Sequence, residues 1–354
     1  MRKVMGIIFQ RWDHELQKFT MNRGISTIPF GGRYRMIDFA LSNLVNANIH
    51  SIGVLGGAKY GSLIDHLGTG QEWSLHRKTQ DLAILPALEN YSIEPGIYFD
   101  LRELQPSKLF IENQTTIEMI IFQPSNQIDN LDFKSLMNKH FDSGNDVTVV
   151  TGEPQIDEAV GDPNENRRKW QGREILAVMV QRSLISQALQ RMEQGGSYDL
   201  LEMIRRNQEH LRVDNVAHKG YYREISDVAG YYKANMDLLE GAVRKELFWS
   251  ERSVFTKSKD NHPTQYCSGV RVNNSWVASG CLICGIVQNS IVSRESMIGE
   301  GSVIKDSILM QRARIGKDVH LEHVILDKTV TIRDRTVLKG TKEEPIVIPK
   351  GSVI

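Results

Sequence analysis

Two arginines at alternate positions in the segment GGRYR have the side chains best suited to binding an anion. Arg33 and Arg35 follow directly on two glycines. A guanidinium group presents several N–H donors in one plane, and this geometry matches the oxygens of a phosphate group. The alternative is structural, with Arg35 forming an ion pair with Asp38 or capping the helix that follows. The pattern makes both arginines candidates for phosphate contact, Arg33 ahead of Arg35.

Metal-ligating side chains are sparse in the sequence. Glu224 and Asp227 lie in REISDV, where each could be a solvated or helix-capping acid. Cys281 and Cys284 form a CxxC without the second pair that a structural zinc site needs. Three cysteines also make no disulfide framework. The residue types by themselves therefore predict no metal site and no bound cofactor.

Composition bounds the class of protein. The chain has 354 residues, 40% of them hydrophobic and 24% charged, and its formal net charge is zero. This length accommodates two domains, and a neutral chain has no general attraction to nucleic acid or to an anionic membrane. No apolar run approaches the roughly 20 residues that span a bilayer. The short run Val4–Phe9 is typical of a buried strand rather than a signal peptide, so we expect a cytoplasmic protein.

The first 246 residues alternate strand-like and helix-like segments. Apolar runs predict strands, and apolar stripes at helical spacing predict helices between them. The strands are expected at Val4–Phe9, Ser51–Leu55, Thr116–Phe122 and Val147–Thr151, and the helices at Arg35–Ala47, Tyr60–Leu67 and Asp132–Ser143. This order predicts a Rossmann-like α/β domain, with a mostly parallel sheet and helices on both faces. Ligands of such sheets bind beyond the carboxyl ends of the strands.

The last 90 residues have a different period. Aliphatic residues recur at steps of about five or six from Met297 onward, often as pairs such as Val303-Ile304, Ile308-Leu309 and Val324-Ile325. This is the hexapeptide pattern of a left-handed parallel β-helix. Because each coil buries its aliphatic residues against its neighbours, the domain must be a continuous stack. We predict domains at residues 1–246 and 266–354, joined by a polar linker at residues 247–265.

Three blocks of sequence resemble the bacterial ADP-glucose pyrophosphorylases (glucose-1-phosphate adenylyltransferases). They are PFGGRYRMIDFALSNLVNANI at residues 29–49, GYYREISDVAGYYKANMDLL at residues 220–239, and SILMQRARIGKDVHLEHVILDK at residues 307–328. The segment HLGTGQEWSLHRKTQDLAILPALEN at residues 66–90 is most similar to the D-type regulatory subunit of this family. The family also combines a nucleotidyltransferase domain with a β-helix, so the resemblance covers nearly the whole chain.

The resemblance implies a reaction and shows where this chain departs from it. Family members convert ATP and glucose 1-phosphate into ADP-glucose and pyrophosphate, with Mg²⁺ and a glycine-rich loop around the triphosphate. Here the loop reads Phe9-Gln10-Arg11-Trp12-Asp13-His14-Glu15, without glycine. Ile25 stands where the family has a phosphate-binding lysine, and Asn126 where it has a Mg²⁺-binding aspartate. Asp129 lies nearby and is a candidate replacement ligand. Glu224 stands where the family has a second carboxylate, which makes it the one weak candidate for a metal ligand. We therefore assign no catalytic residue and treat Ile25, Asn126 and Glu224 as degenerate positions.

These departures predict a regulatory subunit that is catalytically weak or inactive. The resemblance implies a hetero-oligomer, a tetramer, with a catalytic ADP-glucose pyrophosphorylase subunit that uses Mg²⁺. It also implies that Arg33 and Arg35 contact an anionic effector, either a sugar phosphate or phosphate. The alternative is an active sugar-phosphate nucleotidyltransferase with a rebuilt metal and triphosphate site. A third hypothesis is a β-helix acyltransferase that uses His320 or His323, although no coenzyme-binding feature accompanies them and surface positions at coil corners explain these histidines better.

Overall fold

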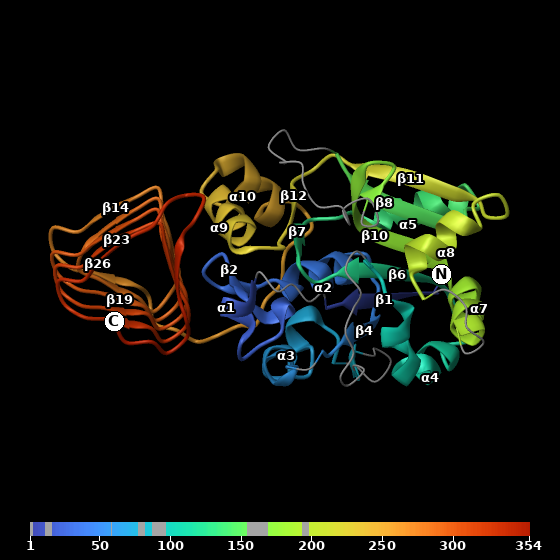
Figure 1. The fold of residues 1–354 in the computed structure, drawn as a ribbon, viewed down its shortest axis with the longest axis horizontal. Helices are drawn as coiled ribbons and strands as arrows, with labels where there is room; N and C mark the ends of the chain where they lie inside the picture. The colour runs from blue at the N-terminus through green and yellow to red at the C-terminus, as the bar shows by residue number, and fades with distance from the viewer. Residues whose placement is uncertain are drawn as a thin grey trace. The chain divides into compact units, whose positions relative to one another are not determined.

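The computed structural model describes residues 3–10, 16–57, 59–76, 82–86, 97–153, 169–192 and 198–354, and it divides into two compact units (Figure 1). The sheet unit comprises Met1–Trp12, Phe39–Tyr222 and Arg252–Phe255. The β-helix unit comprises Asp13–Asp38, Arg223–Glu251 and Thr256–Ile354. Each unit draws on three stretches of sequence. As a result, the GGRYR segment belongs to the same unit as the C-terminal coils.

An eight-stranded sheet forms the centre of the sheet unit. Its strands are β1 (Lys3–Phe9), β4 (Ser51–Leu55), β5 (Leu82–Leu85), β6 (Ile117–Pro124), β8 (Val147–Gly152), β9 (Lys169–Trp170), β10 (Arg173–Gln181) and β11 (Val213–His218). The order is β11-β8-β10-β6-β1-β4-β5, with β9 paired to β10. Strands β6, β1, β4 and β5 are parallel, and so are β8 and β11, whereas β10 runs antiparallel to β6 and β8. The predicted mostly parallel sheet is confirmed, and β10 is an antiparallel strand that the sequence pattern does not reveal.

Helices cover both faces of this sheet. They are α2 (Ile37–Asn46), α3 (Gly61–Leu67), α4 (Lys108–Glu112), α5 (Phe133–Asp142), α7 (Arg182–Met192) and α8 (Leu200–Arg206), with 3₁₀ turns η3 (Gln71–Trp73) and η4 (Leu101–Ser107) and a short strand β7 (Gln127–Asp129). Met5, Ile7 and Phe9 point into the core shared with α4, α7 and α8. Gly6 faces the other way, and a Cβ there would lie 2.5 Å from Cδ1 of Leu44 in α2. Among the described residues, no helix combines the length and apolar character needed to cross a bilayer.

The coils of the β-helix unit form three parallel sheets of five short strands each. The strands are β13 (Gln265–Tyr266), β14 (Arg271–Asn273), β15 (Trp276–Val277), β16 (Leu282–Ile283), β17 (Ile286–Gln288), β18 (Ile291–Val292), β19 (Met297–Ile298), β20 (Val303–Lys305), β21 (Ile308–Leu309), β22 (Arg314–Ile315), β23 (His320–Glu322), β24 (Val324–Leu326), β25 (Thr331–Ile332), β26 (Val337–Lys339) and β27 (Ile346–Ile348). Val303 pairs with His320, which pairs with Val337, so these coils repeat every 17 residues. The predicted coiled architecture is confirmed.

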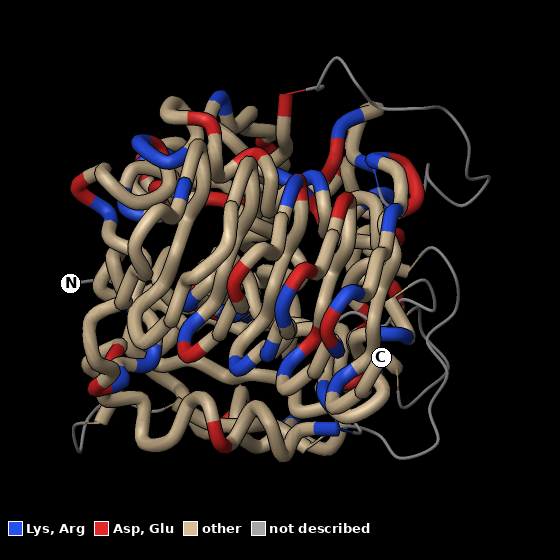
Figure 2. The backbone as a smooth tube through the Cα atoms, turned by 90° about the vertical axis from the view of Figure 1, so that its left-hand side faces the viewer, with Lys and Arg blue, Asp and Glu red and all other residues tan. Residues whose placement is uncertain are grey.

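The coils bury aliphatic side chains inside and carry mixed charges outside. Val287, Ile304 and Leu321 stack in the interior, each at most 1% exposed. This stack is the core that each coil shares with its neighbours. On the outside, acidic and basic residues are interspersed over the coils that face the viewer in Figure 2. The neutral net charge of the chain is therefore matched on this face by a surface without a single dominant sign.

One outer face of the coils is covered by the rest of the β-helix unit. The covering elements are α1 (Gln17–Thr20), η2 (Ile25–Thr27), β2 (Pro29–Phe30), β3 (Tyr34–Arg35), α9 (Val228–Asp237) and α10 (Gly241–Phe248), and the short strand β12 (Tyr222–Glu224) precedes α9. Ile291, Ile308 and Ile325 stack on this face and are at most 2% exposed. The ring centroids of Phe248 in α10 and Trp276 lie 5.4 Å apart. Burial of this apolar face joins the GGRYR segment and α9 to the coils.

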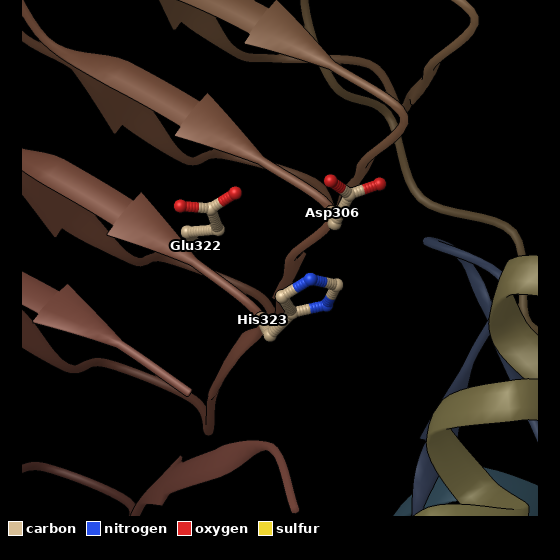
Figure 3. A group of neighbouring side chains, drawn as sticks. All are labelled: Asp306, Glu322 and His323. Atoms are coloured by element: carbon tan, nitrogen blue, oxygen red, sulfur yellow. The ribbon is translucent and has the colours of Figure 1, made fainter. Parts of the chain in front are cut away.

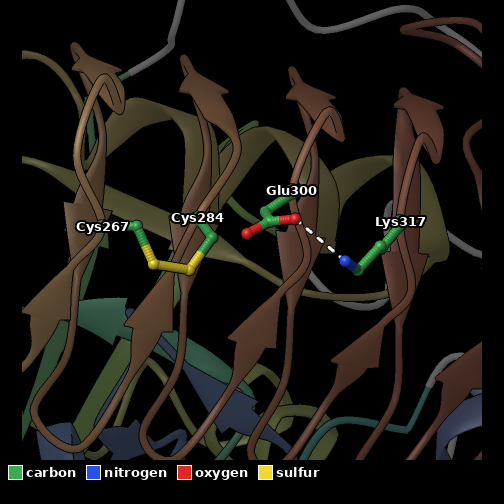
Figure 4. Close-up of a disulfide and its surroundings, with 4 residues drawn as sticks. All are labelled: Cys267, Cys284, Glu300 and Lys317. Carbon is green, nitrogen blue, oxygen red and sulfur yellow. Dashed lines mark hydrogen bonds and ion pairs between the residues drawn. A yellow bond between two sulfur atoms is a disulfide. The ribbon is translucent and has the colours of Figure 1, made fainter.

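A disulfide joins two neighbouring coils (Figure 4). Cys267 and Cys284 are 17 residues apart, and their Cα atoms are separated by 4.8 Å. The number of cysteines predicts no disulfide framework, and the CxxC draws attention to Cys281 and Cys284 instead. In the coil, Cys281 packs in the interior and is 2% exposed, so it faces away from its CxxC neighbour. The coil period, rather than proximity in sequence, decides which sulfur atoms meet.

Candidate functional site

The GGRYR segment forms a tight hairpin. Strands β2 and β3 pair antiparallel, with Phe30 opposite Tyr34. Gly31 and Gly32 connect them with φ values of +55° and +78°, a region that glycine enters without the steric cost paid by other residues. The hairpin leaves Arg33 exposed at its tip. The two glycines of the motif are therefore explained by the turn that presents this arginine.

Helix α9 holds the hairpin in place. The Tyr231 hydroxyl donates a hydrogen bond to the carbonyl oxygen of Pro29. The amide of Gly31 donates to Oδ1 of Asn235 at 3.0 Å. Both side chains on α9 are fully buried, and buried hydrogen bonds are costly to break because the groups left behind have no water to replace them. Two of the three blocks that carry the family resemblance thus contact each other directly.

The coils add two cations to those of the hairpin. Arg294 is only 8% exposed, and its pKa is lowered, first by burial and then by the nearby positive charge of Arg33. Lys328 is half-buried, and burial together with the positive charges of Arg35 and Arg23 lowers its pKa to about 7. Like charges held this close and partly desolvated favour an anion among them. The structure therefore brings both predicted arginines into a cationic cluster.

We call this cluster the basic corner, because its coil members follow one edge of the β-helix. It consists of Arg33, Arg35, Lys259, Arg294, Arg312 and Lys328. Burial is the main cause that lowers the pKa of Lys259, and the negative charge of Glu295 opposes it. The positive charges of Arg312, Arg294 and Arg35 lower this pKa further. Glu295 also accepts a hydrogen bond from Arg312. Asp38, Glu295 and Asp327 are carboxylates that act on members of this cluster.

Sequence reasoning finds only the hairpin members of the basic corner. Arg294 and Lys328 are 34 residues apart, which is two turns of a 17-residue coil. The sequence therefore contains the information that they share an edge. Recognising it requires the exact length of a coil, which the step of five or six residues gives only approximately. Arg35 and Asp38 do contact each other, because the backbone amide of Arg35 donates to Oδ2 of Asp38 at 2.9 Å.

Two of the three degenerate positions, Ile25 and Asn126, are buried. Ile25 begins η2 and is 4% exposed, so an apolar side chain fills the place that the resemblance assigns to a lysine. Asn126 lies between β6 and β7 and is fully buried. The resemblance assigns a carboxylate to this place, and hard cations such as Mg²⁺ prefer charged oxygen ligands, which a neutral amide does not supply. Residues 11–15 of the altered loop, including Trp12, lie outside the described residues.

At the start of the altered loop, the side chains of Phe9 and Gln10 are packed against neighbouring elements. Phe9 ends β1 and packs edge-on against Phe99 and Phe122, with ring centroids 5.3 and 5.7 Å apart. Gln10 is 4% exposed, and its Nε2 donates to the carbonyl oxygen of Gly56 at 3.0 Å. Gln10 thereby links the ends of β1 and β4, the edge of a parallel sheet where ligands usually bind.

Asp129, three residues beyond Asn126, forms hydrogen bonds with side chains of neighbouring elements. Its Oδ1 accepts hydrogen bonds from Asn43 in α2 and from Gln123 in β6. The carboxyl group is fully buried, and this burial raises its pKa to about 7 against the opposing effect of the two hydrogen bonds. A carboxyl group with this pKa is about half protonated at neutral pH, and its Oδ1 serves the contact between α2 and β6.

Glu224 and Asp227 have different surroundings. Asp227 caps α9, and its Oδ1 accepts a hydrogen bond from the amide of Gly230, which is the capping interpretation of this acid. Glu224 is half-buried at the end of β12. Within the described part of the chain, three or more metal-ligating side chains gather only at Asp306, Glu322 and His323. Glu224 therefore belongs to no such group.

Comparison with known proteins agrees with this architecture. The family description "Nucleotidyl transferase" matches residues 15–161, and "GlmU-like, C-terminal hexapeptide" matches residues 259–344. Glycogen biosynthesis protein GlgD of Bacillus subtilis (strain 168) is 32% identical over 99% of this chain and 97% of its own length. GlgD of Geobacillus stearothermophilus is also 32% identical, with the same coverage. The chain belongs to the GlgD and ADP-glucose pyrophosphorylase family. The glucose-1-phosphate adenylyltransferase of Bacillus cereus (strain Q1), another relative, is 26% identical over 95% of each chain.

Membership in this family connects the two observations of the site. The relatives are nucleotidyltransferases and glycogen biosynthesis proteins. At two positions that the resemblance assigns to catalysis, this chain holds a buried isoleucine and a buried asparagine, whereas several cations gather at the basic corner. The family scaffold is retained. Ile25 and Asn126 are uncharged, whereas the basic corner carries several positive charges.

Proposed function

We propose that this chain is a regulatory, catalytically weak or inactive subunit of glucose-1-phosphate adenylyltransferase in glycogen biosynthesis. It acts on a catalytic partner subunit within a hetero-oligomer, a tetramer, located in the cytoplasm. The observation that carries the proposal is the replacement of the expected lysine and aspartate by Ile25 and Asn126, both buried. Phosphoryl transfer depends on positioning and on neutralising charge, and neither residue supplies a charge.

The basic corner gives this subunit a means of regulation. An anionic sugar phosphate or phosphate bound there contacts Arg33 and Arg35 from the hairpin and Arg294 and Lys328 from the coils. Because the hairpin is also held by α9, the ligand joins three parts of the β-helix unit. An effector shifts the conformational equilibrium of a partner subunit only by the difference in its affinity for the two conformations. This coupling is typically about 1–3 kcal/mol.

Loss of anion affinity in Arg33→Ala is the expected result at the basic corner. Sulfate is a suitable probe because its charge is constant near neutral pH. Removing this cation should weaken sulfate binding at least about tenfold, since charge-assisted hydrogen bonds each contribute about 1.5–3 kcal/mol. Isothermal titration of the full chain at low ionic strength measures this. Arg271→Ala, on an exposed strand of the first coil, is the matched control and should bind sulfate like the wild type.

The same titration has a predicted pH dependence. With its pKa at about 7, Lys328 is mostly charged at pH 6 and mostly neutral at pH 8. Sulfate affinity should therefore fall roughly tenfold between these values, following the loss of the ammonium form. Lys328→Met should remove most of that dependence. Equal sulfate affinity in the wild type, Arg33→Ala and Arg271→Ala would overturn the effector assignment.

The alternative function is an active nucleotidyltransferase with a rebuilt metal and triphosphate site. Half-buried Glu224 is the one feature that favours it, because a carboxylate remains at a family metal position. Binding of ATP with Mg²⁺ to the isolated chain separates the two proposals. In Arg33→Ala, where the basic corner contributes little, the regulatory proposal predicts no saturable binding at substrate concentrations up to about 1 mM, the upper end of ordinary KM values.

A further inference from the structure

Three potential metal ligands meet at an edge of the β-helix that is distinct from the basic corner. They are Asp306, Glu322 and His323, each half-buried, and their ligand atoms all lie within 4.8 Å of one another. Glu322 ends β23, whereas Asp306 and His323 directly follow β20 and β23 (Figure 3). Lys305 pairs with Glu322 in the sheet, so the next residues, Asp306 and His323, stack at the same corner.

The backbone at this corner aims the side chains. Asp306 and His323 have φ values of +46° and +52°, and Asn289, one coil earlier, has +45°. This left-handed conformation is uncommon for residues other than glycine, and asparagine, aspartate and histidine enter it more readily than most. Because successive coils repeat the conformation, the imidazole lies next to the carboxylate of the coil before it. Figure 3 shows one ring nitrogen of His323 toward the two carboxylates and the other directed away from them.

Tyr232 of α9 fixes the orientation and tautomer of the imidazole. Its hydroxyl donates to the backbone carbonyl oxygen of Asp306 at 2.7 Å and lies 2.9 Å from Nδ1 of His323. A phenol has one proton, so with that proton given to Asp306, Nδ1 must donate to the phenol oxygen. Nε2 then keeps its lone pair. Metal-binding histidines show this arrangement, in which the second ring nitrogen donates to a fixed acceptor.

A lysine ammonium group already lies beside the two carboxylates. Nζ of Lys305 is 2.6 Å from Oε1 of Glu322 and 3.6 Å from Oδ2 of Asp306. The site therefore already attracts a cation. The Lys305 side chain is 45% exposed, so it can turn into solvent when another cation takes its place. An exposed ion pair contributes little to stability, so breaking it takes little away from the binding free energy of a metal ion.

We propose that Asp306, Glu322 and His323 bind a divalent transition-metal ion of the zinc class, which displaces Lys305. One imidazole nitrogen and two carboxylate oxygens form a three-residue ligand set of the kind Zn²⁺ accepts, with water completing the coordination. Mg²⁺ prefers oxygen ligands alone, so it binds here more weakly. Because Tyr232 connects the imidazole to α9, the metal also stiffens the contact between this helix and the coils.

The test is a titration of the full chain with Zn²⁺ in a buffer that does not bind metals, with Mg²⁺ as a comparison. His323→Asn and Asp306→Asn suit the left-handed backbone, and loss of either ligand should weaken Zn²⁺ binding at least about tenfold. Lys305→Met should strengthen binding by up to about fivefold, because the competing cation of an exposed pair is gone. Tyr232→Phe should weaken it about tenfold or more, as other losses of such outer partners do.

His320→Asn is the matched control, since His320 is exposed at the start of the same strand. Its Zn²⁺ affinity should equal that of the wild type. Binding of Co²⁺ gives a second readout, because its visible absorption reports nitrogen and oxygen ligation directly. The proposal is overturned if the wild type binds no Zn²⁺ at about 100 μM, a weak affinity for such a site, or if His323→Asn and His320→Asn bind it equally well.

Discussion

Replacing either Arg23 or Asp327 with alanine is expected to lower the free energy of unfolding by about 3–5 kcal/mol, the usual cost of leaving one buried charge without its partner. Nη2 of Arg23 donates to both carboxylate oxygens of Asp327, at 2.7 and 2.6 Å. The two side chains are 5% and 2% exposed. This pair fastens the segment that precedes the GGRYR hairpin to the coil that carries Lys328, so its loss should also disturb the basic corner.

Chemical denaturation of single and double variants measures this effect. Lys317→Ala is the matched control, because Lys317 and Glu300 form an exposed pair on the same coils (Figure 4) and should change the unfolding free energy far less. The double variant Arg23→Met with Asp327→Leu should be more stable than either single variant, since it leaves no buried charge unpaired. Single-variant losses no larger than that of the exposed control would contradict the assignment.

Asp129→Asn is expected to change how stability depends on pH. Burial raises the pKa of Asp129 from 3.8 to about 7 in the folded protein. Between these values the folded state holds a proton that the unfolded state has lost, so stability falls as pH rises from about 4 to about 7. A shift of about three pKa units corresponds to about 4 kcal/mol. Asparagine keeps the acceptor for Asn43 and Gln123 without the titration.

The measurement is the difference in unfolding free energy between Asp129→Asn and the wild type at several pH values. That difference should move in favour of the variant as pH rises from about 4 to about 7 and stay constant above. Glu103→Gln should behave in the same direction, because burial and the nearby Asp100 raise the pKa of Glu103 to about 8. Parallel pH profiles for Asp129→Asn and the wild type would show that this carboxyl is ionised in both states.

Local patterns in the sequence are sufficient to predict most of the helices and strands near the site. Strand β4 occurs at the predicted residues, Ser51–Leu55, and α2 lies within the predicted helix Arg35–Ala47. These segments are long or strongly apolar, so their own residues decide their structure. The antiparallel direction of β10 is not evident in the same way, because it depends on its neighbours in the sheet. The discontinuous units are also beyond the reach of local periodicity, which carries no information about long-range packing.

The site is predictable where a motif specifies the backbone. Two glycines before Arg33 imply a turn, and the turn places Arg33 at its tip. Arg294 and Lys328 escape such reasoning because the stacking of coils depends on a 17-residue period that short windows do not measure. The same period explains why Cys284 meets Cys267. The sequence makes Asp129 a possible metal ligand, but its environment depends on a partner 86 residues away.

Formation of ADP-glucose from ATP and glucose 1-phosphate tests the central claim most directly. It should be measured with this chain alone, with a catalytic glucose-1-phosphate adenylyltransferase subunit alone, and with both mixed. We predict no significant turnover by this chain alone and a changed rate or substrate affinity in the mixture. Turnover by this chain alone above about 1 per second, a rate typical of enzymes, or a mixture that behaves as its catalytic subunit alone, would contradict the account.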